Sequence, residues 1–194
     1  MKPDDGCVKM MMDTCSRRDF IKIGTGLAGA WLLPAAGWAA LLPHDSRRSL
    51  AFFNTHTGER LRVCYFRDGA YSSGALQQIN HILRDHRTGD IKVMDRRLMD
   101  LLFTVRHRLG CDDPFHIISG YRSPATNRKL RQQSSGVAKF SYHTLGRAID
   151  IRLPGCDTRK LKQACLDSEL GGVGYYPRSD FVHVDTGAIR TWNG

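Results

Sequence analysis

A carboxylate inside an apolar strand sequence is the feature that most constrains how this chain can fold. Asp150 lies in the run Ala148-Ile149-Asp150-Ile151, which alternates as a short strand does, so both isoleucines face one side and Asp150 faces the other. An ionised carboxylate is costly to bury among such residues unless a partner compensates its charge, and a metal ion is a good partner. We therefore expect this strand to line a metal site.

Two histidines have comparable settings and complete a ligand set. His143 lies in a polar segment shortly before the Asp150 strand, and His183 lies in a second strand sequence, residues 181–185, where it shares a face with Asp185. Two imidazoles and one carboxylate suit zinc, and three protein ligands leave a fourth tetrahedral position for water, as in hydrolytic zinc sites. Affinity order alone does not select zinc over another divalent ion. Six further histidines are interpreted as surface or hydrogen-bonded core residues: His44, His56, His81, His86, His107 and His116.

Arg122 is the candidate for substrate recognition. It follows the apolar run of residues 115–118 and precedes Ser123 and Pro124, which are typical of a helix N-cap and of the first helical position. An arginine held at a strand end by two defined elements is well placed to bind a carboxylate through two hydrogen bonds. The alternative is a solvated charge, because the chain contains 29 lysines and arginines.

These residues lie in strings that resemble a known family. The pattern Ser-x-His-x-x-Gly-x-Ala-x-Asp, at residues 141–150, resembles the zinc-dependent D-Ala-D-Ala peptidases of the bacterial cell wall, and residues 119–124 resemble their substrate-arginine loop. Residues 171–187 are similar to one branch of that family, the murein endopeptidase K-like proteins. The likeness covers about residues 49–194, with three motifs in the same order.

The resemblance implies a role for each matching residue. The two histidines and Asp150 would bind one zinc ion, and Arg122 would bind the substrate carbonyl or carboxylate and stabilise the oxyanion. Asp180, three residues before the last histidine ligand, occupies the position of the general base. It would take a proton from a zinc-bound water whose pKa is lowered to about 7, and pass it to the leaving amine.

The assignment of the base has an alternative. Residues three apart on a regular strand point to opposite faces, so Asp180 reaches the metal only if the chain bends near residues 179–180, which Pro177 favours. Asp185 shares a face with His183 without any bend, and is the alternative as base or as a partner that orients a ligand. A third interpretation of Asp180 is a solvated turn residue.

The N-terminal segment predicts export. Residues 16–22, Ser-Arg-Arg-Asp-Phe-Ile-Lys, match the twin-arginine export signal, and the uncharged stretch that follows, 23–38, is shorter than a typical membrane span. We expect a signal peptide at 1–39, a polar lead-in at 40–48, a peptidase domain at 49–194 and a periplasmic location without a stable membrane span. An uncleaved N-terminal anchor is the alternative.

Charge and cysteine content agree with export. Loss of residues 1–39 removes five basic and four acidic residues, so the net charge falls only from +10 to +9. A domain with this positive charge is expected to attract polyanions such as peptidoglycan carboxylates. Nucleic acid is disfavoured, because the arginines are scattered and no nucleic-acid motif occurs. The absence of a Cys-x-x-Cys motif disfavours a zinc ribbon. Four cysteines remain, with three pairings open: Cys64, Cys111, Cys156 and Cys165.

Hydrophobic periodicity predicts a single α+β domain. Strands are expected at residues 50–54, 60–66, 115–118, 148–151, 181–185 and 188–192, and helices after residues 72–73 and at 95–110, 123–132 and 157–168. The expected architecture is a small antiparallel sheet with helices packed on one face and zinc at its open side, as in Hedgehog/DD-peptidase-like proteins. A loop at 133–142 is expected to form a wall of the cleft.

The sequence thus predicts an exported zinc metallopeptidase that hydrolyses peptide cross-links of peptidoglycan, in cell wall remodelling. The alternatives are a D-Ala-D-Ala carboxypeptidase, a wall-binding module that keeps zinc without turnover, and a basic structural protein without metal.

Overall fold

The computed structural model describes residues 45–134 and 136–194 of the 194-residue chain. The expected signal peptide, the cleavage position and the first residues of the lead-in lie outside the described residues. Among the residues that the structure describes, no helix has both the length and the apolar character needed to cross a membrane.

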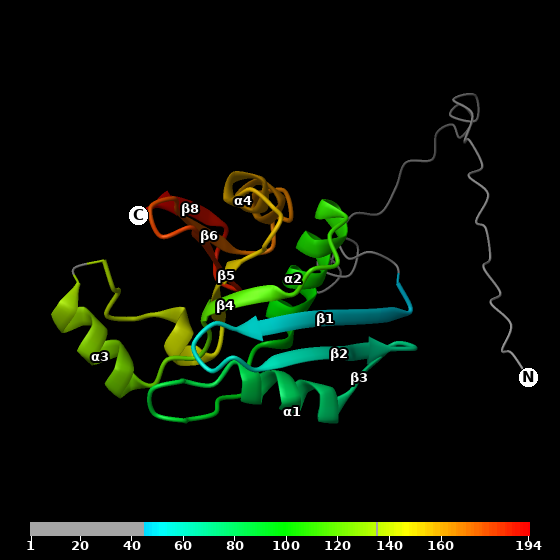
Figure 1. Cartoon of the computed structure of the whole chain (residues 1–194), viewed down its shortest axis with the longest axis horizontal. Helices are drawn as coiled ribbons and strands as arrows, with labels where there is room; N and C mark the ends of the chain where they lie inside the picture. Colours follow the sequence, from blue (N-terminus) through cyan, green and yellow to red (C-terminus); the bar gives the residue numbers. More distant parts are fainter. Residues whose placement is uncertain (1–44, 135) are drawn as a thin grey trace, which may run out of the picture. The chain divides into compact units, whose positions relative to one another are not determined.

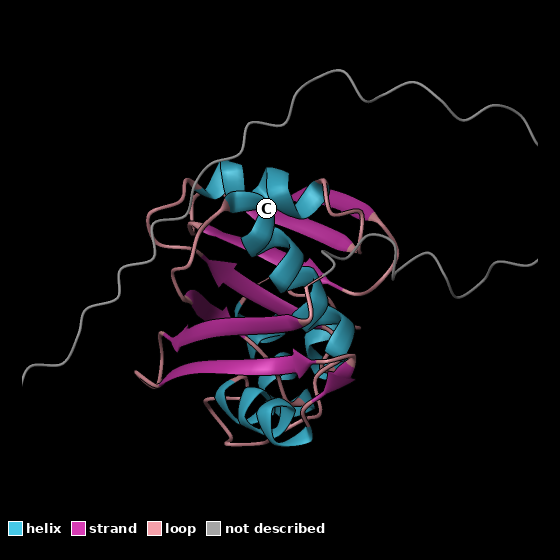
Figure 2. Cartoon of the chain, turned by 90° about the vertical axis from the view of Figure 1, so that its right-hand side faces the viewer, coloured by secondary structure: helices cyan, strands magenta, loops and turns pink. Residues whose placement is uncertain are grey.

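The centre of the fold is one mixed sheet of eight strands, in the order β3-β2-β1-β4-β5-β7-β6-β8 (Figures 1 and 2). The strands are β1 (Arg47–Asn54), β2 (Arg60–Arg67), β3 (Ala70–Tyr71), β4 (Phe115–Ser119), β5 (Ala148–Arg152), β6 (Gly172–Tyr176), β7 (Phe181–Asp185) and β8 (Arg190–Asn193). Neighbouring strands are antiparallel except for the pairs β1–β4 and β6–β8. The predicted α+β class is confirmed. The sheet is larger than expected because β3 and β6 were not predicted, and the expectation of a purely antiparallel sheet was wrong because β1–β4 and β6–β8 pair in parallel.

The helices begin at the capping residues that the sequence indicates. They are α1 (Ser73–Ile82), α2 (Arg96–Leu109), α3 (Pro124–Gln133) and α4 (Thr158–Leu166), with a 3₁₀ turn, η2 (Tyr142–Leu145). The side chains of Ser72, Asp95, Ser123 and Asp157 each accept a hydrogen bond from a backbone N–H of the first turn. Gly110 ends α2 in the left-handed conformation.

The hydrophobic core lies between the sheet and three of these helices. α1 packs against β2, α2 against β1, and α4 against β6 and β7. By contrast, α3 projects away from the sheet (Figure 1). The core-facing residues of β5 and β7 are fully buried: Ile149, Ile151, Val182 and Val184. Because side chains alternate along a strand, the polar residues of β5 and β7 face the opposite side of the sheet, where the site lies.

Candidate metal centre

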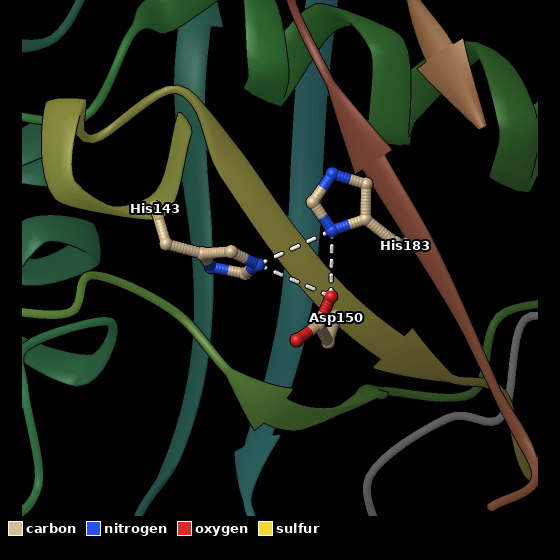
Figure 3. A group of neighbouring side chains, drawn as sticks. All are labelled: His143, Asp150 and His183. Carbon is tan, nitrogen blue, oxygen red and sulfur yellow. Dashed lines mark hydrogen bonds and ion pairs between the residues drawn. The ribbon is translucent and has the colours of Figure 1, made fainter. Parts of the chain in front are cut away.

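The structure brings the three predicted ligands together. His143 comes from η2, Asp150 from β5 and His183 from β7, and their ligand atoms all lie within 4.8 Å of one another (Figure 3). The Nδ1 atom of His183 lies 2.8 Å from Oδ1 of Asp150, and the Nε2 atom of His143 lies 3.2 Å from both of these atoms. All three side chains are buried or nearly so.

Strand pairing accounts for two of these positions and a local turn for the third. Asp150 of β5 stands directly opposite His183 of β7 in the antiparallel register, so both side chains lie on one face. His143 lies in the turn before β5. The backbone N–H of His143 donates a hydrogen bond to the side chain of Ser141. Gly146 ends that turn in the left-handed conformation, which a glycine adopts readily.

Outer hydrogen bonds orient both imidazoles. The Nδ1 atom of His143 lies 2.7 Å from the carbonyl oxygen of Gly120, and the Nε2 atom of His183 lies 3.0 Å from Oδ2 of Asp185. A carbonyl and an ionised carboxylate only accept hydrogen bonds, so both of these ring nitrogens carry protons. When both rings are neutral, the nitrogens that face Asp150 therefore present lone pairs. Three acceptors converge on one point, an arrangement that a cation satisfies and that fits a metal ion.

The surroundings favour the ligating forms of His143 and Asp150, but not that of His183. Burial alone would lower the pKa of His183, but the hydrogen bonds to Asp150 and Asp185 raise it, so a metal ion that binds here has to displace a proton from this ring. Burial lowers the pKa of His143, which favours the neutral ring. Burial alone would raise the pKa of Asp150, but the adjacent His143 and His183 hold that pKa well below its usual range. Burial likewise opposes ionisation of Asp185, whose pKa is nevertheless lowered by hydrogen bonds from His183 and Arg190. Ligation requires a neutral imidazole and an ionised carboxylate.

Arg122 lies at the site, as expected. Its Nη2 donates to Oδ2 of Asp150 at 2.6 Å, and its Nε donates to the Ser119 hydroxyl at 2.8 Å. These two bonds fix the plane of the guanidinium group at the wall of the cavity that contains the three ligands. Arg122 is therefore a cation held beside the three candidate ligands, and not a solvated surface charge.

The two candidate bases have different surroundings. Asp180 occupies the turn before β7 with a φ of +50°, so the expected bend is present. Its side chain is 56% exposed, pairs with Arg152 at 2.8 Å and also accepts from the Thr158 hydroxyl, and Asp180 does not line the cavity. Asp185 has no exposed surface and contacts the outer nitrogen of His183. The contacts of Asp185 are those of a residue that orients a ligand, whereas the role of Asp180 as base stays a prediction.

The cavity around the ligands has a volume of about 440 Å³. One wall is the segment after α3, which includes Val137, Phe140 and Tyr142, as expected for the loop at 133–142. The other wall is aromatic and includes Tyr176, Phe181 and Trp192. The three candidate ligands thus lie between a loop and the last three strands of the sheet, β7, β6 and β8.

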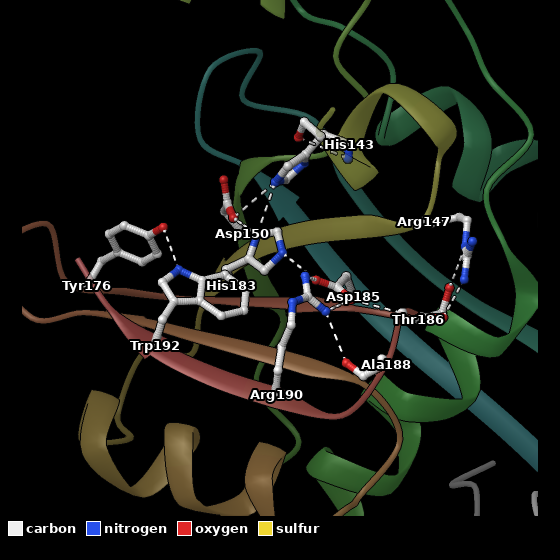
Figure 4. A network of polar contacts seen from close by, with 12 residues as sticks. His143, Arg147, Asp150, Tyr176, His183, Asp185, Thr186, Ala188, Arg190 and Trp192 are labelled. Carbon is white, nitrogen blue, oxygen red and sulfur yellow. Dashed lines mark hydrogen bonds and ion pairs between the residues drawn. The ribbon is translucent and has the colours of Figure 1, made fainter. Parts of the chain in front are cut away.

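Two residues of the site, Arg190 and Trp192, were not predicted. Both come from β8, which is separated from β7 by β6, yet Arg190 bonds to Asp185 and the Trp192 ring lies 5.2 Å from the His183 ring (Figure 4). They reach that far because β6 carries glycine at positions 172 and 174. A Cβ on Gly174 would lie 2.6 Å from the indole, and one on Gly172 would collide with the Arg190 guanidinium. The alternation Gly-Val-Gly was the available signal.

Comparisons with known proteins show which family the chain is similar to. The family model described as Peptidoglycan L,D-endopeptidase MepK matches residues 43–192. The chain is 42% identical over 177 residues to the Peptidoglycan L,D-endopeptidase MepK of Escherichia coli (strain K12), covering 91% of this chain and 97% of that protein. It is 38% identical over 180 residues to the Probable peptidoglycan L,D-endopeptidase MepK of Haemophilus influenzae, covering 92% and 96%.

Proposed function

The chain belongs to the peptidoglycan L,D-endopeptidase MepK family, and from this premise we propose that it hydrolyses peptide cross-links of peptidoglycan in a zinc-dependent reaction. The observation that carries the zinc assignment is the convergence of two imidazole lone pairs and one carboxylate oxygen on a single point. His143, Asp150 and His183 would hold the ion. Zinc supplies Lewis acidity and an activated water to such a site when bound.

Arg122 stabilises the charge that develops during hydrolysis. The bonds to Ser119 and Asp150 fix its guanidinium group before the substrate arrives. A cation that is already held in place loses little free energy to reorganisation when the scissile carbonyl becomes an oxyanion. In this proposal Arg122 binds the scissile carbonyl or an adjacent carboxylate of the cross-link.

Asp180 is proposed as the general base and Asp185 as a positioning residue. The support for Asp180 is its position three residues before His183, together with the bend that frees it from strict strand alternation. To act as base, its carboxylate has to leave Arg152 and rotate towards the cavity when substrate binds. Asp185 is already engaged by His183 and Arg190, and therefore fixes the orientation of a ligand.

Neither alternative function is favoured by an observation. The named relatives are endopeptidases, which does not support a carboxypeptidase. A wall-binding module without turnover does not require a held arginine beside the ligand set. The proposed location is the periplasm, reached through the twin-arginine pathway, because the substrate lies there and residues 16–22 match that signal.

The test is a digestion of isolated peptidoglycan by the purified chain, analysed by mass spectrometry with and without chelator and combined with a measurement of metal content. Near-stoichiometric zinc and a chelator-sensitive loss of cross-linked fragments would support the proposal, and the fragment masses would identify the bond. Zinc without new fragments would favour the binding module. Absence of zinc would overturn the ligand assignment.

A further inference from the structure

We propose that Trp192 determines substrate specificity: its fixed indole forms the wall against which the aliphatic side chain of the cross-linking amino acid packs. This inference rests on the proposed function, because it concerns the substrate of the same site. Three observations support it: the indole lies beside the proposed metal ligands, its contacts hold it in place, and the rest of the cavity wall has a matching chemistry.

The sheet places Trp192 in the row of residues that contains the ligands. Asp150 pairs with His183, His183 pairs with Gly174, and Gly174 pairs with Trp192, so these four positions cross β5, β7, β6 and β8 on one face. The glycine leaves room for the indole to extend over β6 towards His183. If the scissile bond of a substrate lies at the proposed metal ligands, the substrate groups next to that bond therefore contact Trp192.

The indole is held in place without a ligand. Its Nε1 donates a hydrogen bond to the hydroxyl of Tyr176 at 3.0 Å (Figure 4). The Tyr176 ring in turn stacks on Phe181 with centroids 4.4 Å apart. The guanidinium carbon of Arg190 lies 4.9 Å from the indole ring. A side chain that is already ordered loses little conformational entropy on binding, so its apolar contact with a substrate contributes to affinity almost in full.

The rest of the cavity indicates the class of side chain that would pack there. Val137 and Phe140 are apolar residues of the opposite wall, and the charged lining residues outside the proposed metal ligands are Arg122 and Arg190. Among the described residues that line the cavity, the only carboxylate is Asp150, which belongs to the ligand set. Apolar walls with cationic side chains favour a long aliphatic side chain that carries a carboxylate, and disfavour one that ends in a cation.

The assignment is tested by varying the length of the aliphatic side chain of the cross-linking amino acid. We would compare two synthetic cross-linked peptides, one joined through diaminopimelate and one through a homologue that is two methylenes shorter and keeps the carboxylate. Each methylene in an apolar pocket changes kcat/KM by about tenfold or more. The two peptides differ by two methylenes, so the native chain is expected to prefer the longer peptide by about a hundredfold or more. Trp192→Ala is expected to reduce that preference to less than about threefold.

Two further variants separate loss of the wall from loss of the fold. Trp192→Phe keeps an aromatic ring and is expected to retain part of the preference. Gly174→Ala leaves the tryptophan in the sequence but displaces the indole, and is expected to lose the preference as Trp192→Ala does. Phe53→Ala is the control, because Phe53 is a half-buried aromatic residue of β1 that does not line the cavity. It is expected to keep the full preference.

A binding measurement makes the inference independent of hydrolysis. The chain has three tryptophans, so replacement of Trp31 and Trp38 by phenylalanine leaves Trp192 as the single fluorophore. Titration of this metal-free protein with both peptides is expected to change its fluorescence, with tighter binding of the longer peptide. If hydrolysis proceeds but Trp192→Ala keeps the preference, the inference is wrong while the proposed function stands. If no variant hydrolyses either peptide, the proposed function fails, and equal or absent binding in the titration overturns the inference as well.

Discussion

Arg190 donates two hydrogen bonds to the fully buried carboxylate of Asp185, at 2.7 and 3.0 Å, across the glycine at position 172. The same carboxylate bonds to the outer nitrogen of His183 at 3.0 Å. A chain of contacts therefore runs from the edge strand β8 to His183, a proposed metal ligand. Hydrogen bonds to a ligating imidazole fix its orientation and its tautomer, so in the proposed metal site Arg190 would act on His183 through Asp185 without itself being a ligand.

Arg190→Gln is expected to weaken zinc binding by about tenfold or more, because Asp185 then loses its charged partner and His183 its fixed orientation. Arg190→Lys keeps the charge but not the geometry of the two hydrogen bonds, and is also expected to weaken zinc binding. Competition with a chromogenic chelator measures the affinity. Arg178→Gln removes an exposed arginine outside the cavity and serves as the control. Unchanged affinity in Arg190→Gln would show that this contact does not support the site.

Removal of a ligand is expected to abolish both metal content and metal-dependent stability. His183→Ala leaves two of the three converging groups, so we expect zinc content to fall from about one per chain to near zero. A ligand that binds only the folded state raises the melting temperature, so added zinc should raise Tm of the native chain and not of the variant. His107→Ala, which alters a histidine outside the ligand set, is the control. Equal zinc content in His183→Ala would contradict the assignment.

Asp85 is expected to make stability depend on pH. Its buried carboxylate accepts hydrogen bonds from the backbone N–H groups of Arg87 and Ser123, and so ties a loop to the segment that carries Arg122. Burial alone would raise the pKa of Asp85, but the hydrogen bonds from Thr126, Ser123 and Arg87 lower it to about 2. A depressed pKa contributes stability that is present above about pH 4 and is lost as the pH falls towards 2.

Asp85→Asn is therefore expected to lower the free energy of unfolding by roughly 2 kcal/mol at pH 7, and by progressively less between pH 4 and pH 2. Urea unfolding at a series of pH values measures this difference. Asp68→Asn alters an exposed turn residue and is expected to leave the profile unchanged. A difference that persists undiminished at pH 2 would contradict ionisation as its cause.

If residues 16–22 are a twin-arginine signal, replacement of the arginine pair should abolish export of the protein. Replacement of both Arg17 and Arg18 by lysine is expected to retain the protein in the cytoplasm, because the signal depends on the arginine pair. Fractionation of cells that produce the tagged chain measures this. The control is Lys22→Arg, which keeps the charge and the pair. Periplasmic recovery of the double variant would exclude this route.

The pairing of Asp150 with His183 on one face was predictable, because strand alternation exposes a misplaced polar residue. Asp150 and His183 interrupt apolar runs, and this pattern alone places both on the face opposite the core. The contacts from β8 were not predictable in the same way. They depend on the parallel pairing of β6 with β8, which fixes Arg190 opposite Gly172 and Trp192 opposite Gly174. A sequence does not specify which distant strands pair, so the register and its consequences needed the structure.

The surroundings of Asp180 show the same limit. Its spacing from His183 is the one that the resemblance noted in the sequence predicts for a base. Its partners Arg152 and Thr158, however, come from β5 and α4, which lie 28 and 22 residues away in the sequence. The local sequence around Pro177 predicted the bend at Asp180, whereas the ion pair with Arg152 forms only through tertiary packing. The role of this residue is therefore decided by experiment on both members of that pair.

Asp180→Asn is expected to lower kcat by at least a hundredfold without change in zinc content, because an amide cannot accept the proton that a general base removes. Asp185→Asn is expected to act differently, lowering zinc affinity and sparing kcat at saturating zinc. Arg152→Gln separates catalysis from structure, since it breaks the ion pair and leaves the Asp180 carboxylate in place. If Asp180 is the base, Arg152→Gln retains kcat. If Asp180→Asn keeps kcat within about threefold and both variants lose similar stability, then Asp180 is a turn residue whose carboxylate serves the ion pair, and the base lies elsewhere.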